Sequence, residues 1–284
     1  MIGNRDWSDF IGRTHEETIQ ISLDCVRGLA ALLDYDRPPW PDNRVPPTGH
    51  WLAMFPYTRQ SELGHDGHEK LGDFIPDTGH PRRMWVGGRI QYLKPLYVDQ
   101  PVLHRTTITN IEDKTGKTGP MTFVTLNHEY LMDTELLLGE EQKIVYREAS
   151  TEPAQRPINK PVSKSESEYD WSRQFMPDSA VLFRYSAVTF NTHKIHFDHE
   201  YVKEEGYPGL LVHAPLTVTL LVELYTSINP DMKIISFDYT AKSPLYDGDP
   251  IMLYGKELED GKVLLWAEDC AGNLAVTGTL QVEN

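Results

Sequence analysis

A nine-residue pattern occurs twice in the chain, and this internal repeat constrains the fold more than any other feature. Pro95-Leu-Tyr-Val-Asp-Gln-Pro-Val-Leu103 reappears as Pro244-Leu-Tyr-Asp-Gly-Asp-Pro-Ile-Met252. The offset of 149 residues is about half of the 284-residue chain. Runs of β-forming residues separated by turn signals follow both copies. A chance tripeptide followed by a turn is the alternative, but an offset of half the length favours a duplicated domain.

Each half also carries one segment with the pattern of a helix ahead of its β-rich runs. In the first half, Thr14-x-x-Glu17 has the form of a capping box and apolar residues follow at helical spacing, which predicts a helix over residues 15–33. In the second half, residues 214–228 are apolar nearly all round, as in a helix enclosed by other structure. Pro215 stands in its first turn, where a missing N–H is tolerated.

Two stretches rich in proline, glycine or polar residues interrupt this pattern. Residues 151–168 have the composition of a linker, and residues 37–81 form an insertion or lid. We therefore expect one domain over residues 1–150 and a second over residues 169–284. A helix followed by antiparallel strands, present twice, predicts an α+β chain with a tandem (double) hot-dog fold, each half a curved sheet wrapped round a central helix. A pair of unrelated α+β domains is the alternative.

Composition excludes several classes of function. The chain has 27 Lys and Arg against 42 Asp and Glu, a net charge of −15, so nucleic acid is not an expected partner. Cys25 and Cys270 stand alone, which excludes a disulfide scaffold or a zinc ribbon. The sequence has no apolar run long enough to span a membrane and no signal peptide. We expect a cytoplasmic protein without a membrane partner, with the mitochondrial matrix as the other possible location.

Polar side chains cluster just ahead of the enclosed helix. Asn191, His193, His196 and Asp198 fall within eight residues. They lack the helical spacing of a metal-binding pair, so no metal is expected. The remaining interpretations are hydrogen bonding in a surface turn and a general base, for which His196 is the candidate. Asp198 is a candidate catalytic residue or a helix cap.

The stretches around this cluster resemble a known motif. Thr-Phe-Asn-Thr-His-Lys-Ile-His-Phe-Asp at residues 189–198 and Glu-Gly-Tyr-Pro-Gly-Leu-Leu-Val-His-Ala-Pro-Leu at residues 205–216 are similar to the hydratase motif of MaoC-like double hot-dog proteins. The nearest branch holds hydroxyacyl-thioester dehydratase type 2 and the mesaconyl-/3-methylfumaryl-CoA and itaconyl-CoA hydratases. Residues 60–68 and 81–89 resemble the N-terminal signatures of that branch, so the resemblance covers nearly the whole chain.

The resemblance implies a hydro-lyase that adds water across an α,β-unsaturated acyl-CoA thioester. The family motif reads Asp-x-Asn-Pro-x-His, and His196 matches its histidine, while Asn191 takes the place of the catalytic aspartate. An amide orients water but does not accept a proton, so His196 must carry the deprotonation. Ala214 replaces the usual glycine at the helix start and keeps the backbone N–H that would form an oxyanion hole. Only the second half carries this motif, so one active site is expected.

The favoured substrate is a short branched dicarboxylyl-CoA such as itaconyl-CoA or mesaconyl-CoA. The alternatives are a 3-hydroxyacyl-thioester dehydratase of fatty-acid or polyketide type, and a pseudoenzyme or another lyase, because Asn191 replaces the aspartate. We expect no cofactor other than the CoA of the substrate, and a monomer or homodimer. The negative protein repels CoA at long range, so a local basic rim is needed to bind CoA or a second carboxylate. The candidates for substrate binding are Arg82, Arg83, Arg89, Arg184 and His213, the last being also a possible structural donor.

Overall fold

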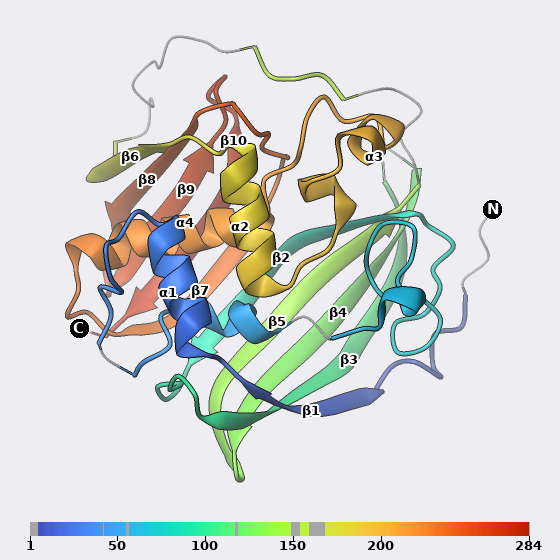
Figure 1. The fold of residues 1–284 in the computed structure, drawn as a ribbon, viewed down its shortest axis with the longest axis horizontal. Helices are drawn as coiled ribbons and strands as arrows, with labels where there is room; N and C mark the ends of the chain where they lie inside the picture. Colours follow the sequence, from blue (N-terminus) through green and yellow to red (C-terminus); the bar gives the residue numbers. More distant parts are fainter. Residues whose placement is uncertain are drawn as a thin grey trace.

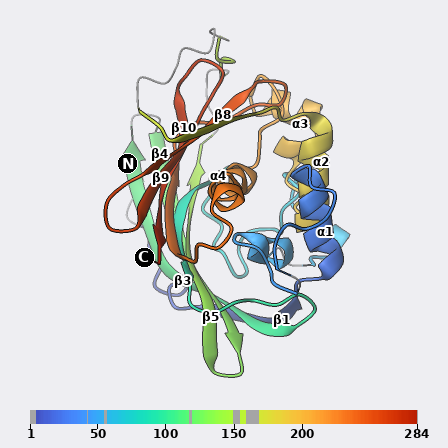
Figure 2. The ribbon, with the colours of Figure 1, turned by 90° about the vertical axis from the view of Figure 1, so that its left-hand side faces the viewer.

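In the computed structural model, ten strands form one antiparallel sheet that curves around a layer of helices (Figures 1 and 2). The structure describes residues 5–41, 43–54, 57–116, 119–148, 154–158 and 168–283. The strand order is β1-β3-β4-β5-β2-β7-β10-β9-β8-β6. From the outer edge of the sheet to its centre, the strands of the first half come in the order β1-β3-β4-β5-β2 and those of the second half in the order β6-β8-β9-β10-β7. The two orders are equivalent, and the halves are joined where β2 pairs with β7.

In each half, one strand is followed by a helical stretch and then by four strands, although the helices differ. The strands of the first half are β1 (Thr14–Gln20), β2 (Arg82–Tyr92), β3 (Pro101–Gly116), β4 (Gly119–Met132) and β5 (Glu135–Arg147). Those of the second half are β6 (Trp171–Phe175), β7 (Ile234–Ala241), β8 (Ile251–Glu257), β9 (Lys262–Glu268) and β10 (Leu274–Val282). The α-helices are α1 (Leu23–Leu32), α2 (Ser179–Thr189), α3 (His199–Glu204) and α4 (Ala214–Ile228), and the 3-10 helices are η1 (Gly49–Ala53), η2 (Gln60–Glu62) and η3 (Lys194–His196).

Two glycines allow the halves to join in one sheet. Gly88 on β2 pairs with Tyr239 on β7, and β2 has a bulge next to Gly87. A Cβ atom at Gly87 would lie 2.6 Å from the Tyr239 carbonyl oxygen, and one at Gly88 would lie 2.3 Å from the Glu141 carbonyl oxygen. Because no side chain fits at either position, the Gly-Gly pair is required where the central strands meet.

The predicted helix over residues 15–33 is wrong in its first part. Residues Thr14–Gln20 form β1, an edge strand that pairs with β3, and α1 begins only at Leu23. The N-cap is Ser22, whose Oγ accepts the Cys25 N–H at 3.1 Å. Thr14 and Glu17 therefore matched the capping box by coincidence, and the tertiary pairing with β3 overrides the local signal.

The two halves differ in what their sheets enclose. The predicted helix over residues 214–228 is confirmed: α4 lies against β8, β9 and β10, and its residues 215–225 are all buried. In the first half, α1 instead packs against α2, and the short η1 contacts both of these helices. Trp51 of η1 is 1% exposed and packs against Trp85 on β2 and Tyr239 on β7.

The predicted linker lies largely outside the described residues, since 151–153 and 159–167 are not among them. The last strand of the first half ends at Arg147 and the first strand of the second begins at Trp171. The domain boundaries at residues 150 and 169 stay a prediction. Across the described part of the chain, no helix is long and apolar enough to cross a membrane.

Candidate active site

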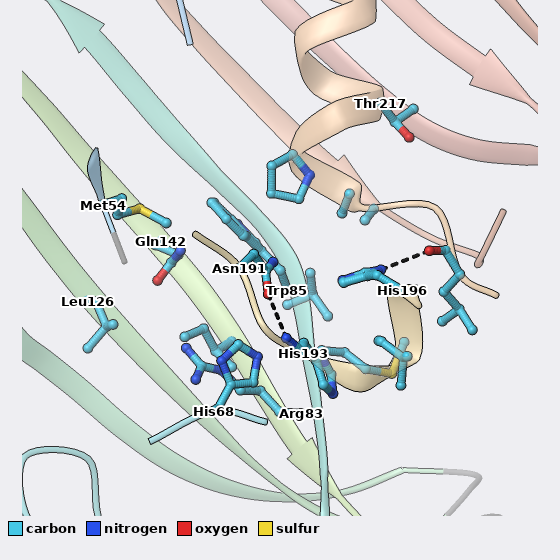
Figure 3. A pocket seen from close by; sticks show the side chains of 18 of the residues that line it. Met54, His68, Arg83, Trp85, Leu126, Gln142, Asn191, His193, His196 and Thr217 are labelled. Carbon is cyan, nitrogen blue, oxygen red and sulfur yellow. Dashed lines mark hydrogen bonds between the residues drawn. The ribbon is translucent and has the colours of Figure 1, made fainter. Parts of the chain in front are cut away.

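Both halves contribute to one cavity of about 280 Å³ between the sheet and the start of α4 (Figure 3). Its wall in the second half includes Asn191, His193, His196, Ala214 and Thr217. The first half contributes residues from β2, β3, β4 and β5 and from the loop before β2, among them His68, Arg83, Trp85, His104, Thr106, His128 and Gln142. The motif of the second half thus opens into a space that the first half closes.

His196 is held with one ring nitrogen toward the cavity. It ends η3, and its Nδ1 lies 2.8 Å from the Leu211 carbonyl oxygen (Figure 3). Because a carbonyl only accepts, Nδ1 carries the hydrogen and Nε2 keeps its lone pair. Burial lowers the pKa of His196 to about 4, although the hydrogen bond to Leu211 works in the other direction. At neutral pH the ring is therefore uncharged, as a general base must be.

Asn191 is fixed by the backbone on both sides. Phe190, with φ of 55°, ends α2, and the Asn191 N–H donates to the Ser186 carbonyl at 2.9 Å. Its Oδ1 accepts the His193 N–H at 3.0 Å (Figure 3). This bond orients the amide, so Nδ2 is the group left for the cavity. Among the described residues nothing accepts a hydrogen bond from Nδ2, which leaves it for a water molecule or a substrate oxygen.

The start of α4 supplies the backbone donor expected from the sequence. Ala214 is the first residue of the helix and lines the cavity. The first N–H groups of a helix have no partner within the helix and lie at the positive end of its dipole. Pro215 has no N–H, so Ala214 carries the donor at this edge. A developing negative oxygen near Ala214 would be stabilised there.

The insertion before β2 clamps the stretch that carries Asn191 and His193. The Thr192 hydroxyl donates to the Gly67 carbonyl at 2.6 Å, and the Lys194 N–H donates to the Asp66 carbonyl at 2.8 Å. The His68 ring lies 4.5 Å from the His193 ring, measured between centroids. The insertion is therefore part of the site, and the geometry of the motif depends on the first half.

Three further histidines in and behind the site are neutral. Burial is the main cause that holds the pKa of His68, His193 and His213 well below the usual value. Arg83 and the neighbouring histidine rings lower these pKa values further. His213 is fully buried and stacks on His196 with ring centroids 3.5 Å apart. Its Nε2 lies 2.9 Å from Ser186 Oγ. His213 therefore supports the His196 ring from behind.

Several predicted site residues lie away from the cavity wall. Asp198 caps α3, where its Oδ1 accepts the Glu200 and Tyr201 N–H groups at 3.0 and 3.1 Å. Its carboxylate is used by the helix, which corrects the catalytic assignment. His213 is likewise not in a position to touch substrate, because the His196 ring covers it.

Of the four predicted arginines, only Arg83 lines the cavity. Arg82 is 6% exposed and its Nε donates to Glu205 at 2.7 Å, so its charge is already paired. Arg89 is exposed and faces Asp238 at 3.7 Å. Arg184 is exposed on α2. The basic rim expected from the sequence thus reduces to one interior arginine.

Sequence reasoning missed other residues of the cavity. Lys242, exposed in the loop after β7, lines its edge. His68 lies within the 60–68 stretch that carried the family resemblance, and Lys242 stands just before the repeated Pro244 segment, so both had a signal close by. His104, Thr106, His128 and Gln142 come from long strands without any motif. No group of His, Cys, Asp or Glu suited to a metal ion occurs among the described residues.

A double hot-dog sheet that encloses a helix, with an uncharged histidine in the cavity at the start of that helix, is typical of the MaoC-like hydratase and dehydratase class, although Asn191 stands where that class has an aspartate. The comparisons with known proteins agree. A family model, hydroxyacyl-thioester dehydratase type 2, matches residues 48–247, and the chain belongs to this family. The sequence is 37% identical to mesaconyl-C(4)-CoA hydratase of Chloroflexus aurantiacus, with 99% of both chains covered. The resemblance seen in the motifs is thereby confirmed.

Solved structures bear out the fold. HtdX of Mycobacterium tuberculosis is similar with a TM-score of 0.69 at 19% identity, over 95% of this chain and 99% of the other. A second protein of that organism, described as having a double hotdog fold, is similar with a TM-score of 0.59 at 13% identity, and both chains are covered completely. These similarities establish the tandem hot-dog architecture predicted from the repeat.

Proposed function

We propose that the protein is a hydro-lyase that adds water across the α,β double bond of a short acyl-CoA thioester. The observation that carries the proposal is that His196, Asn191 and the Ala214 N–H line one cavity, with the Nδ1 of His196 already engaged. The relative named mesaconyl-C(4)-CoA hydratase, similar over the full length, supports the same reaction class.

The groups divide the reaction between them. The Nε2 of His196 removes a proton from a water molecule that Asn191 orients, and the oxygen forms a bond to the β-carbon. The electron pair of the double bond moves toward the thioester oxygen, where the Ala214 N–H stabilises the negative charge. The α-carbon then takes the proton back from the imidazolium, so HO and H are added without another reactant. Dehydration is the same path in reverse.

The name of the same relative supports mesaconyl-CoA, a short branched dicarboxylyl-CoA, as the substrate, and itaconyl-CoA is the other candidate of this type. The name of the matching family supports a second candidate, dehydration of a 3-hydroxyacyl thioester, less strongly than the full-length relative supports hydration, and this reaction would use the same groups. The proposed chemistry is acid–base throughout, so we propose no cofactor beyond the CoA of the substrate. A cytoplasmic location and a monomer or homodimer remain predictions.

The test is loss of the ultraviolet absorbance of the enoyl thioester with crotonyl-, mesaconyl- and itaconyl-CoA. We expect the His196→Gln variant to lose about 10²–10⁴-fold in kcat, because it removes the general base. His199→Gln is the matched control, since His199 lies three residues away, is exposed and does not line the cavity. Wild-type turnover of none of the three thioesters, with measurable binding of CoA esters, would instead support a pseudoenzyme or another lyase.

A further inference from the structure

Arg83 lies inside the cavity rather than on its rim. Its side chain is 16% exposed, whereas that of Arg89, six residues along the same strand, is 53% exposed. The nearest carboxylate to Arg83 belongs to Glu69, at an N···O distance of 3.8 Å. Within the described residues, Arg83 donates no hydrogen bond of ordinary length. A guanidinium that is largely withdrawn from solvent, with five donors and so weak a partner, has room for an anion.

The surroundings of Arg83 keep its charge available. The neighbouring His68 and His193 are neutral, and the charge of Arg83 contributes to holding the pKa of both rings low, after burial. Burial opposes the charge of Arg83 itself, but Tyr146, Glu69 and Asp66 raise its pKa above the usual value. This corner of the cavity therefore holds a fixed positive charge next to the catalytic stretch, while the protein as a whole is negative.

We propose that Arg83 binds the second carboxylate of a dicarboxylyl-CoA substrate and so determines acyl specificity. This inference rests on the proposed function. In a substrate of the mesaconyl-C(4) type the second carboxylate is attached to the β-carbon that water attacks. Its partner must then lie beside the water-binding groups, and Arg83 lies beside His193, two residues from Asn191 (Figure 3). The planar guanidinium matches a carboxylate in fork geometry.

The Arg83 site also discriminates against an alkyl group. A methyl group in place of the carboxylate would leave the largely buried guanidinium with only the Glu69 carboxylate, at 3.8 Å, as its ionic partner. A site built to hydrogen-bond a substrate group rejects the analogue that lacks it far more strongly than an apolar pocket rejects a size change. The long-range field of the protein disfavours a second negative charge, so any preference for a carboxylate must come from a local cation.

Direct binding calorimetry with two unreactive thioesters tests the inference. Succinyl-CoA carries a carboxylate where butyryl-CoA carries a methyl group, and neither has a double bond to hydrate. We expect wild-type protein to bind succinyl-CoA at least about tenfold more tightly. Arg83→Gln should abolish this preference, and Arg89→Gln, the matched control on the same strand, should retain it. For turnover, the ratio of kcat/KM for mesaconyl-CoA to that for crotonyl-CoA should fall about 10²-fold in Arg83→Gln only.

The outcomes separate this inference from the proposed function. Equal binding of the two thioesters by the wild-type protein overturns the role of Arg83, even if crotonyl-CoA is hydrated. A preference for succinyl-CoA that depends on Arg83, without hydration of any enoyl-CoA, supports the carboxylate site and overturns the hydratase proposal. If circular dichroism shows that Arg83→Gln does not fold, equal binding of the two thioesters by the wild-type protein still overturns the role of Arg83.

Discussion

Gly67 is the position where a single methyl group should displace the stretch that carries Asn191 and His193. It has φ of +92°, and a Cβ atom added there would lie 2.0 Å from the Thr192 carbonyl oxygen and 3.6 Å from the His193 Cα. The same loop accepts a hydrogen bond from the Thr192 hydroxyl and another from the Lys194 backbone N–H. In a Gly67→Ala variant, the added methyl group must therefore push residues 192–194 or the loop itself.

The size of the effect follows from the geometry. The contact with the Thr192 oxygen must lengthen by about 1 Å to reach the closest distance that real Cβ atoms show. A displacement of about 1 Å in a catalytic group costs about 10²-fold in rate. A non-glycine residue in the left-handed region costs about 1–2 kcal/mol, and the overpacking adds about 1–3 kcal/mol. We expect Gly67→Ala to lose about 2–5 kcal/mol of stability and about 10²-fold in kcat/KM.

A Gly72→Ala variant in the same insertion is the control that separates the effect of backbone strain from that of displacing residues 192–194. Gly72 has φ of +111°, but a Cβ atom there has nothing within 4 Å. Gly72→Ala should therefore lose only about 1–2 kcal/mol, with kcat/KM within about twofold of wild type. Urea denaturation gives the stabilities, and loss of the enoyl-thioester absorbance gives kcat/KM. If the two variants lower kcat/KM by the same factor, the insertion does not position the site and the reasoning is refuted.

Three other predictions follow from the charges of the site. The acid limb of the kcat/KM profile should lie near pH 4, because burial lowers the pKa of His196 to about 4, and a limb near the ordinary 6.5 would contradict this. The buried histidines should also make folding acid-sensitive: their folded pKa is below the unfolded value, so stability is complete above pH 6.5 and decreases toward pH 4, by up to about 1.4 kcal/mol per pH unit for each ring. The rings concerned are those of His68, His128, His193, His196 and His213. Urea denaturation at several pH values measures the change in the free energy of unfolding with pH, which should be absent if these rings titrate normally. Lys242→Ala should raise KM for a CoA thioester about fivefold at low salt with kcat unchanged, whereas Lys233→Ala, which breaks an exposed pair with Glu283, should not.

The sequence was sufficient to predict the fold because the duplication leaves a direct trace. Pro95 and Pro244 begin equivalent segments, and the equal strand order of the two halves in the sheet reflects this repeat. The apolar pattern of residues 214–228 predicted α4 correctly, since an enclosed helix has no polar face. The start of the chain was misassigned because β1 depends on pairing with β3, which lies some 90 residues away in sequence and has no local signal.

The site was predictable where the chemistry is local and not where it depends on packing. Asn191, His196 and Ala214 belong to one motif, and the structure places all three on the cavity wall. Arg82 and Arg83 are indistinguishable in sequence, but neighbours on a strand point to opposite faces, so one pairs with Glu205 and the other faces the cavity. The sequence predicts that the side chains of Arg82 and Arg83 point to opposite faces of the sheet, but it does not predict which face holds the cavity.

The first half lacks the long enclosed helix of the second half. At the position of α4 it has only η1, a single 3-10 turn that offers no extended helix dipole. His50 of η1 is committed to Glu140, at 3.0 Å, with both side chains at most 1% exposed. Trp51 and Tyr239 also donate to Glu140.

Burial would raise the pKa of Glu140, but the hydrogen bonds from His50 and Trp51 and the nearby histidines bring this pKa below its usual value. Because Tyr239 belongs to β7, this buried carboxylate ties the halves together. The first copy thus contributes this anchor, Arg83 on the cavity wall and the clamp on Thr192, while Asn191, His196 and Ala214 come from the second copy.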